Sequence, residues 1–314
     1  MLHTLQEDAV LPRFNRQRRS TAVVGLALAA LTLAACGSDD DAGTQTDAGE
    51  EGTSQVDQAL ADLVPDEISE DGTITIGTDP TYAPNEFLDT DGSTVIGFDV
   101  DLFNAVAAKL GLDTEWVASD FSDIIPGVGS AKYEIGVSSF TINAERLETV
   151  DMVSYFSAGT QWAVKSGNPS GVDPDAACGK KVAVQTGTVQ ETDDLPVRNQ
   201  ACTGAGQPEI TIEPYQAQDQ ATAAVVSGKD DAVLADSPVM AYAVQQTNGQ
   251  LELLGEIYDA APYGYVIEKD QGDFGQAIAD ALAALIEDGT YAEILDEYGV
   301  GDGAIDDPQV NPSV

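Results

Sequence analysis

Short strand-forming runs and amphipathic helices alternate along most of this chain, and this alternation restricts the fold more than any other feature. Strands are predicted from Gly72 onward at 73–76, 95–96, 135–137, 181–184, 210–212 and 231–234. Helices are predicted at 99–111, 122–132, from 143, and at 189–200, 218–227, 238–246, 274–287 and 291–298. Such alternation is typical of an α/β fold.

Two further features concern the start of the first helix and the C-terminal end of the chain. Asp99 precedes Leu102, Phe103 and Val106 at helical spacing, so we expect Asp99 to cap the first helix. The last residues, 301–314, show no clear pattern and are expected to be frayed.

The first 35 residues have the layout of a secretory signal. Four arginines between positions 13 and 19 precede an apolar run at 22–35, which is shorter than the roughly 20 residues that span a bilayer. The run ends in LAAC, which resembles the bacterial lipobox and implies lipid attachment at Cys36. An ordinary cleaved signal with an incidental cysteine is the alternative.

The mature chain is strongly acidic. Residues 1–35 carry four of the 13 basic and two of the 54 acidic side chains, and removing them leaves a net charge of −43. Such a surface repels nucleic acid, so no nucleic-acid partner is expected. Solubility outside the cell is a sufficient explanation of the charge. Residues 36–69 are rich in small and acidic side chains and are predicted to be a disordered acidic tether.

Histidine and cysteine usage weighs against catalysis. The sole histidine, His3, lies in the predicted signal, so the mature chain has no Ser-His-Asp unit and no metal site built on histidine. No cofactor or metal is predicted. Cys178 and Cys202 are expected to form a disulfide, worth roughly 3 kcal/mol in the chain-entropy model.

The segment 76–102 reads IGTDPTYAPNEFLDTDGSTVIGFDVDL and places Asp79 and Tyr82 in a loop after the first strand. It resembles the first ligand-facing loop of the extracellular solute-binding proteins of polar amino acid ABC importers (family 3). It is similar to the histidine- and lysine/arginine/ornithine-binding members. The resemblance covers about residues 72–298. It implies a two-lobe periplasmic-binding-protein fold (type II) with a two-strand hinge.

The resemblance also divides the chain. Lobe 1 is expected at 70–158 and 261–305, lobe 2 at 159–260, and a C-terminal tail at 306–314. The lobes would close on a ligand by hinge motion.

Arg146 is the first residue that the resemblance assigns to the ligand. It lies five residues beyond Thr141 and matches the arginine that binds the ligand α-carboxylate, with Ser138, Ser139 and Thr141 as further polar contacts. The alternative is a surface salt bridge to Glu145 or Glu148.

In the second lobe, Gly187 and Thr188 follow a strand and open a helix, where main-chain N–H groups can bind an anion. Val189 stands where the family usually has a hydroxyl residue, so it offers an N–H alone. Asp236 matches the aspartate that accepts the ligand α-ammonium. Its alternative role is to cap the helix at Pro238.

Three residues would surround the ligand side chain. Tyr82 and Phe121 match aromatic lining residues, although an isolated aromatic is more often part of the core. Asp79 matches the aspartate that receives a side-chain nitrogen in the basic amino acid binders, so it favours a nitrogen-bearing side chain.

The sequence therefore predicts a lipid-anchored, monomeric, non-enzymatic receptor on the outer face of the cell membrane. It would capture a polar amino acid, with basic side chains as candidates, and deliver it to the transmembrane subunits of an ABC permease. Two alternatives are a cyclohexadienyl-dehydratase-like enzyme on the same fold and a sensory lipoprotein that binds a ligand without transport.

Overall fold

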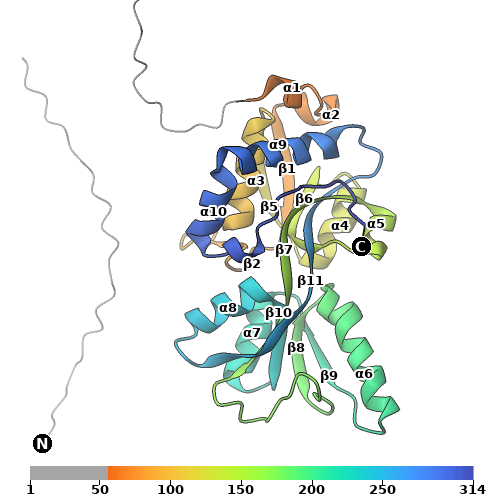
Figure 1. Ribbon diagram of the computed structural model, residues 1–314, viewed down its shortest axis with the longest axis vertical. Coiled ribbons are helices and arrows are strands. Elements are labelled where there is room, and N and C mark those ends of the chain that lie inside the picture. The colour runs from red at the N-terminus through yellow and green to blue at the C-terminus, as the bar shows by residue number, and fades with distance from the viewer. Residues whose placement is uncertain (1–55, 314) are drawn as a thin grey trace, which may run out of the picture. The chain divides into compact units, whose positions relative to one another are not determined.

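The computed structural model describes residues 56–313, and its framework is an eight-stranded sheet with the order β5-β1-β6-β11-β7-β10-β8-β9 (Figure 1). A small second sheet has the order β2-β3-β4. The strands are β1 (Thr73–Thr78), β2 (Thr81–Tyr82), β3 (Glu86–Leu88), β4 (Val95–Ile96), β5 (Asp113–Ala118), β6 (Ile135–Thr141), β7 (Asp151–Lys165), β8 (Lys181–Gln185), β9 (Thr211–Tyr215), β10 (Ala232–Asp236) and β11 (Leu251–Ile267).

The two longest strands, β7 with 15 residues and β11 with 17, run through both halves of the large sheet (Figure 1). In one half β11 pairs antiparallel with β6, and β1 pairs parallel with β5 and β6. In the other half β7 pairs antiparallel with β10, and β8 pairs parallel with β9 and β10. The register between β7 and β11 shifts between residues 254 and 261 of β11. We call the half with β1, β5 and β6 lobe 1, the half with β8 to β10 lobe 2, and the shared strands the hinge.

Lobe 1 is built on a large aromatic core. Its main helices are α3 (Phe98–Lys109), α4 (Phe121–Gly129), α5 (Ala144–Thr149), α9 (Phe274–Asp288) and α10 (Thr290–Tyr298). Tyr155 of β7 and Tyr265 of β11 are fully buried, and their rings stack with centroids 4.1 Å apart. Phe103 of α3 packs edge-on against Tyr265 at 5.0 Å. The hinge strands are therefore anchored in lobe 1 by their own aromatic side chains.

Lobe 2 contains a π-helical turn η1 (Gln190–Asp194) and the helices α6 (Leu195–Gly204), α7 (Gln218–Ser227) and α8 (Ser237–Gln246). The predicted disulfide is confirmed, because Cys178 and Cys202 are bonded with their Cα atoms 5.6 Å apart. Cys202 is buried on α6 and belongs to the same core cluster as Trp162 and Leu195. The bridge therefore holds the loop before β8 against α6.

The segment 56–69 is folded, so the prediction of a disordered tether reaching residue 69 is wrong at its C-terminal end. It forms α1 (Gln58–Ala61) and α2 (Asp66–Ser69), and Asp57 caps α1 with its side chain. Val64 and Ile68 are buried in the core of lobe 1. Leu60 and Leu63 pack against the same core, so a few apolar side chains among acidic neighbours dock this short segment.

The C-terminal segment is ordered as well, so the prediction that residues 301–314 are frayed is wrong for those that the structure describes. A short 3₁₀ turn η2 (Gly301–Gly303) leads to a stretch that lies along β7, where Val310 bridges to Val153. The Asn311 side chain accepts from Met152 N at 2.9 Å and donates to Asp151 at 2.9 Å. The segment is held by hydrogen bonds to a strand edge, which leave no periodic pattern in the sequence.

Two helix starts differ from the predictions. The helix expected at 189–200 begins as the π-helical turn at Gln190, and its α-helical part starts at Leu195. The helix expected to be capped by Asp99 begins at Phe98 with Gly97 in the cap position, and Asp99 itself is fully buried. Asp99 is thus part of the interior near the candidate site.

Within residues 56–313, no helix combines the length and the apolar character that crossing a bilayer requires. The predicted signal peptide at 1–35 and the candidate lipidation site Cys36 lie outside the described residues.

Candidate functional site

A small cavity lies between the two lobes beside the hinge. Eight of the predicted ligand residues line it, together with Gln190. The space left between their side chains is about 10 Å³, which corresponds to about one water molecule. The lining residues are Tyr82, Phe121, Ser139, Thr141 and Arg146 from lobe 1 and Thr188, Val189, Gln190 and Asp236 from lobe 2.

The side chain of Arg146 extends from lobe 1 and contacts lobe 2. It lies at the start of α5, where the side chain of Asn143 accepts its main-chain N–H at 2.8 Å. Its guanidinium donates from Nη1 to Thr141 O at 2.7 Å and from Nη2 to Gly187 O at 3.1 Å, and it lies over the rings of Phe121 and Phe140 at 5.6 and 5.4 Å. No salt bridge of Arg146 occurs in the described part of the chain, so the surface-pair alternative is wrong.

Burial lowers the pKa of Arg146 to about 10, so the group remains charged at neutral pH. Its acceptors are two neutral carbonyl oxygens, which compensate a buried cation only in part. A guanidinium with free donors in a closed cavity is suited to a bidentate carboxylate.

Asp236 provides the opposite charge from the end of β10 in lobe 2. It accepts hydrogen bonds from Tyr82 Oη at 2.9 Å, Tyr263 Oη at 2.7 Å and Gln190 Nε2 at 2.8 Å. Although Asp236 occupies the cap position of α8, its side chain makes no capping hydrogen bond, so the capping alternative is wrong. Burial raises its pKa, while the three donors oppose the shift. A carboxylate in this position can accept an ammonium group.

Several hydrogen bonds hold the lobes together around this cavity. The pairs are Tyr82 with Asp236, Arg146 with Gly187, and Thr81 Oγ1 with Gln218 N at 3.1 Å. The structure therefore has the lobes closed, with polar groups of the two walls hydrogen bonded to each other.

The loop that follows β8 differs from the prediction. Gly187, with φ at +83°, donates its N–H to Glu191 Oε2 at 2.6 Å, and Thr188 Oγ1 donates to Gln185 O at 2.8 Å. The N–H of Gly187 is thus already bound to an anionic side chain. Among the three residues predicted to bind an anion here, Thr188 and Val189 line the cavity and Gly187 does not.

Asp79 is buried but is absent from the cavity wall. Its Oδ1 accepts from Thr81 Oγ1 at 2.8 Å, and its Oδ2 accepts from Phe121 N at 3.0 Å and from Gln185 Nε2 at 2.7 Å. Burial raises the pKa of Asp79 to about 6. The donor from Gln185 comes from lobe 2, so Asp79 takes part in closing the lobes rather than facing the cavity in this conformation.

The two serines use their hydroxyl groups within the protein. Ser138 Oγ donates to Glu86 at 2.9 Å and accepts from Asp79 N at 3.1 Å. Ser139 Oγ accepts from Asn85 Nδ2 at 2.8 Å and lies 3.2 Å from the carboxyl oxygens of both Glu86 and Asp99. Ser138 is therefore behind the wall, whereas Ser139 borders the cavity with its hydroxyl and its main-chain N–H already bound within lobe 1.

The sequence reading missed Gln190 and Tyr263. Gln190 borders the cavity, and its side chain donates hydrogen bonds to Asp236 and Thr160. Tyr263, which lies in β11, donates a hydrogen bond to Asp236. Gln190 is one residue beyond Val189, the last residue assigned in this loop, and this adjacency was the available signal. Tyr263 lies in the hinge, far along the chain from Tyr82 and Phe121, and nothing in the local sequence marks it.

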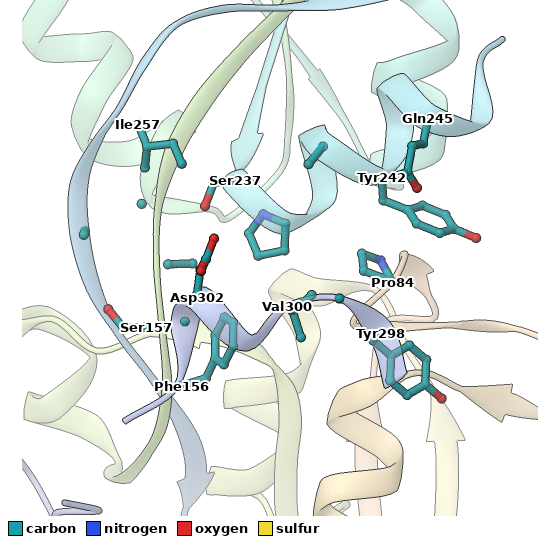
Figure 2. A pocket seen from close by; sticks show the side chains of 17 residues that line it. Pro84, Phe156, Ser157, Ser237, Tyr242, Gln245, Ile257, Tyr298, Val300 and Asp302 are labelled. Carbon is teal, nitrogen blue, oxygen red and sulfur yellow. The ribbon is translucent and has the colours of Figure 1, made fainter. Parts of the chain in front are cut away.

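A larger open cleft of about 350 Å³ lies elsewhere between the lobes (Figure 2). Figure 2 shows Tyr242 and Gln245 on one side and Val300 and Asp302 on the other, with Ile257 from the hinge. Of the described residues that line it, Asp302 alone is charged. Because this cleft has no cation for a carboxylate, it is a poorer amino acid site than the small cavity.

The family follows from comparison with known sequences. Residues 74–301 match the model of the bacterial extracellular solute-binding proteins, family 3. The chain belongs to this family. The match begins at β1 and ends beyond α10, so it includes both lobes and the hinge.

Individual relatives agree with this membership. The chain is 37% identical to the arginine-binding protein ArgT of Corynebacterium glutamicum over 94% of its own length and 96% of that protein. It is 29% identical to the lysine/arginine/ornithine-binding periplasmic protein of Escherichia coli, over 72% of this chain and 87% of that protein. Among solved structures, an ancestral arginine-binding protein bound to arginine aligns with a TM-score of 0.66 and 34% identity, covering 72% of this chain and 98% of the other. The predicted family and two-lobe fold are thus confirmed.

Proposed function

We propose that this family member binds the main-chain groups of a polar amino acid between Arg146 and Asp236. The main support for this binding mode is the arrangement of charges in the cavity. A partly buried guanidinium from lobe 1 has neutral acceptors, and a buried carboxylate from lobe 2 is bound by neutral donors. The two opposite charges face the same cavity without a direct ion pair, and a zwitterion would give each of them a partner in hydrogen-bond contact.

A basic amino acid, arginine in particular, is the proposed ligand. The similarity to proteins named for arginine binding supports this choice, as does the acidic group at the Asp79 end of the site. In the closed structure Asp79 Oδ2 accepts from the side-chain nitrogen of Gln185. A ligand guanidinium would take over that acceptor, because it offers a charged nitrogen donor in place of a neutral one.

Ligand entry would require the lobes to separate. About 10 Å³ of space cannot hold an amino acid, since small-molecule sites generally measure about 300–1,000 Å³. The shifted register of the hinge strands gives a place where the backbone can bend. The hydrogen bonds between Tyr82 and Asp236 and between Arg146 and Gly187 would break on opening and re-form in part around the ligand.

The cellular role that we propose is delivery of the ligand to an ABC permease by a monomeric protein held at the membrane through lipid on Cys36. Membership of an extracellular solute-binding family supports this role. Replacing Cys36 with serine in the full chain would move the protein from the membrane fraction to the soluble fraction. Retention of the variant in the membrane fraction would contradict the anchor.

The binding claim is tested by titration calorimetry with arginine. We expect Arg146→Ala to weaken binding by about 2–5 kcal/mol, because one partner of a buried charge pair is removed. Arg198→Ala is the matched control, since Arg198 is a half-buried arginine of lobe 2 that pairs with Asp194 at 2.7 Å and does not border the cavity. Equal affinities of the Arg146 variant and the wild type would contradict the assignment. Turnover of arogenate or prephenate by the wild type would instead favour the dehydratase-like alternative.

A further inference from the structure

Two acidic side chains, Glu86 and Asp99, meet in the interior of lobe 1 directly behind the cavity wall. Both are fully buried, and Ser139 Oγ lies 3.2 Å from a carboxyl oxygen of each. Glu86 begins β3 and Asp99 lies in the first turn of α3. The mechanism proposed above does not use either residue.

The main chain brings these two residues together. At the start of α3, Asp99 N donates to Asn85 O at 3.0 Å and Phe98 N donates to Pro84 O at 3.2 Å. Gly97 precedes them with φ at +137°, and a Cβ there would lie 2.0 Å from Asn85 O. The docking of α3 onto this loop therefore requires glycine at position 97.

Among residues 56–313, no basic group forms a salt bridge with the pair. Its hydrogen-bond donors are Ser138, Ser139 and Tyr155, with Tyr155 Oη 2.7 Å from Asp99 Oδ2. The other titratable groups that face it are Asp79, Tyr82 and Tyr265, none of which is cationic.

Two adjacent buried carboxylates without a cation cannot both be ionised at ordinary cost. Burial raises the pKa of both groups, that of Asp99 to about 6 and that of Glu86 well above its ordinary range. Asp99 Oδ1 is buried and has no donor among the other described groups. A proton held between the two carboxyl groups gives Asp99 the missing donor.

The pair also determines the conformation of a cavity residue. Ser139 borders the cavity and has φ at +54°, a left-handed conformation that is unfavourable for a residue with a side chain. Its N–H donates to Asp99 at 3.1 Å, and its hydroxyl contacts both acids. These contacts hold Ser139 in this conformation at the cavity wall.

We propose that Glu86 and Asp99 share a single proton, and that this acid pair is a positioning device that fixes Ser139 for ligand binding. The positioning part rests on the proposed function, because Ser139 matters to a ligand only if the cavity binds one. The proton sharing does not rest on it. Loss of the proton would place two negative charges against each other and release the hydrogen bonds to Ser139.

The first test follows thermal stability with pH in the ligand-free protein. In the unfolded chain Glu86 ionises near its ordinary pKa of about 4.3, whereas the folded protein keeps the proton. Folding of the wild type therefore takes up a proton, and its stability falls as the pH rises above that value. Glutamine keeps a donor and does not titrate, so we expect the Tm of Glu86→Gln to exceed that of the wild type by an amount that grows from pH 5 to pH 8.

The matched control is Glu115→Gln, which changes an exposed glutamate of lobe 1. Its Tm difference from the wild type should stay constant over the same range. A constant difference for Glu86→Gln as well would overturn the shared proton.

The second test measures positioning. We expect faster hydrogen exchange at the Ser139 amide and weaker arginine binding in Glu86→Ala, with both restored toward wild type in Glu86→Gln. Wild-type exchange in a folded Glu86→Ala protein would overturn the positioning role. If the wild type binds no amino acid, the proposed function fails, while the Tm and exchange measurements still decide the acid pair.

Discussion

The two ends of the candidate site satisfy their charges in different ways. At one end Arg146 donates to carbonyl oxygens and Asp236 accepts from neutral hydroxyl and amide groups. At the other end both oxygens of Asp79 are occupied, one by Thr81 and the other by Phe121 N and Gln185. The first end has two opposite charges that line one cavity without a direct ion pair, and the second has a carboxylate with donors on both oxygens.

This difference suggests a division of labour. A buried charge whose direct partners are all neutral gains a large free energy from a charged ligand group in contact with it, so the Arg146–Asp236 end should supply most of the affinity. At the Asp79 end a ligand nitrogen replaces an existing hydrogen bond from Gln185, so the gain is a difference between two donors. That end should supply selectivity.

The largest expected effect is at the first end. Asp236→Asn removes the charge that would bind the α-ammonium, and we expect a loss of about 2–5 kcal/mol for every amino acid ligand, as for Arg146→Ala. Calorimetry with both arginine and glutamine measures it. An effect confined to one ligand would break the comparison, because it would make Asp236 a selectivity residue.

A smaller and selective effect is expected at the second end. Asp79→Asn removes one charge but keeps an oxygen acceptor, and we expect arginine binding to weaken by about 1.5–3 kcal/mol. Glutamine binding should change far less, since its side chain is uncharged. Equal losses for the two ligands would show that Asp79 acts on lobe closure alone.

The smallest effect is on pH dependence. The pKa of Asp79 is raised to about 6 by burial, so the carboxylate is charged above that pH and becomes protonated below it. A cationic ligand prefers the charged form, and its affinity should therefore be constant above pH 6 and fall below it, by no more than about tenfold per pH unit. Glutamine is the control, because Asp236 would bind the α-ammonium group of both ligands. Any pH dependence that comes from Asp236 therefore affects the arginine and glutamine affinities equally. In Asp79→Asn the difference in pH dependence between the ligands should vanish.

Much of the fold could be predicted because it depends on periodic burial. Strands such as β1 and β10 and helices such as α7 and α9 follow from runs of apolar residues. The docked segments could not be predicted in this way. Val64 and Ile68 anchor the N-terminal segment, and Asn311 holds the C-terminal one, through single contacts with distant parts of the chain.

The candidate site shows the same limit. Resemblance placed Arg146 and Asp236 at the site, and the geometry brings both to one cavity. The partners of Ser139 and Asp79 could not be read from sequence, because Glu86, Asp99 and Gln185 reach them from other elements. Asp99 looked like a helix cap since it precedes a helical pattern, and only the docking of α3 shows that it is buried.

The central claim is that Arg146 binds the α-carboxylate of the ligand. It is tested most directly by comparing arginine with agmatine, which lacks that carboxylate, in calorimetric titrations of the wild type and of Arg146→Ala. We predict that the wild type binds arginine far more tightly than agmatine, and that this difference disappears in the variant. The same difference between the two ligands in both proteins would contradict the account.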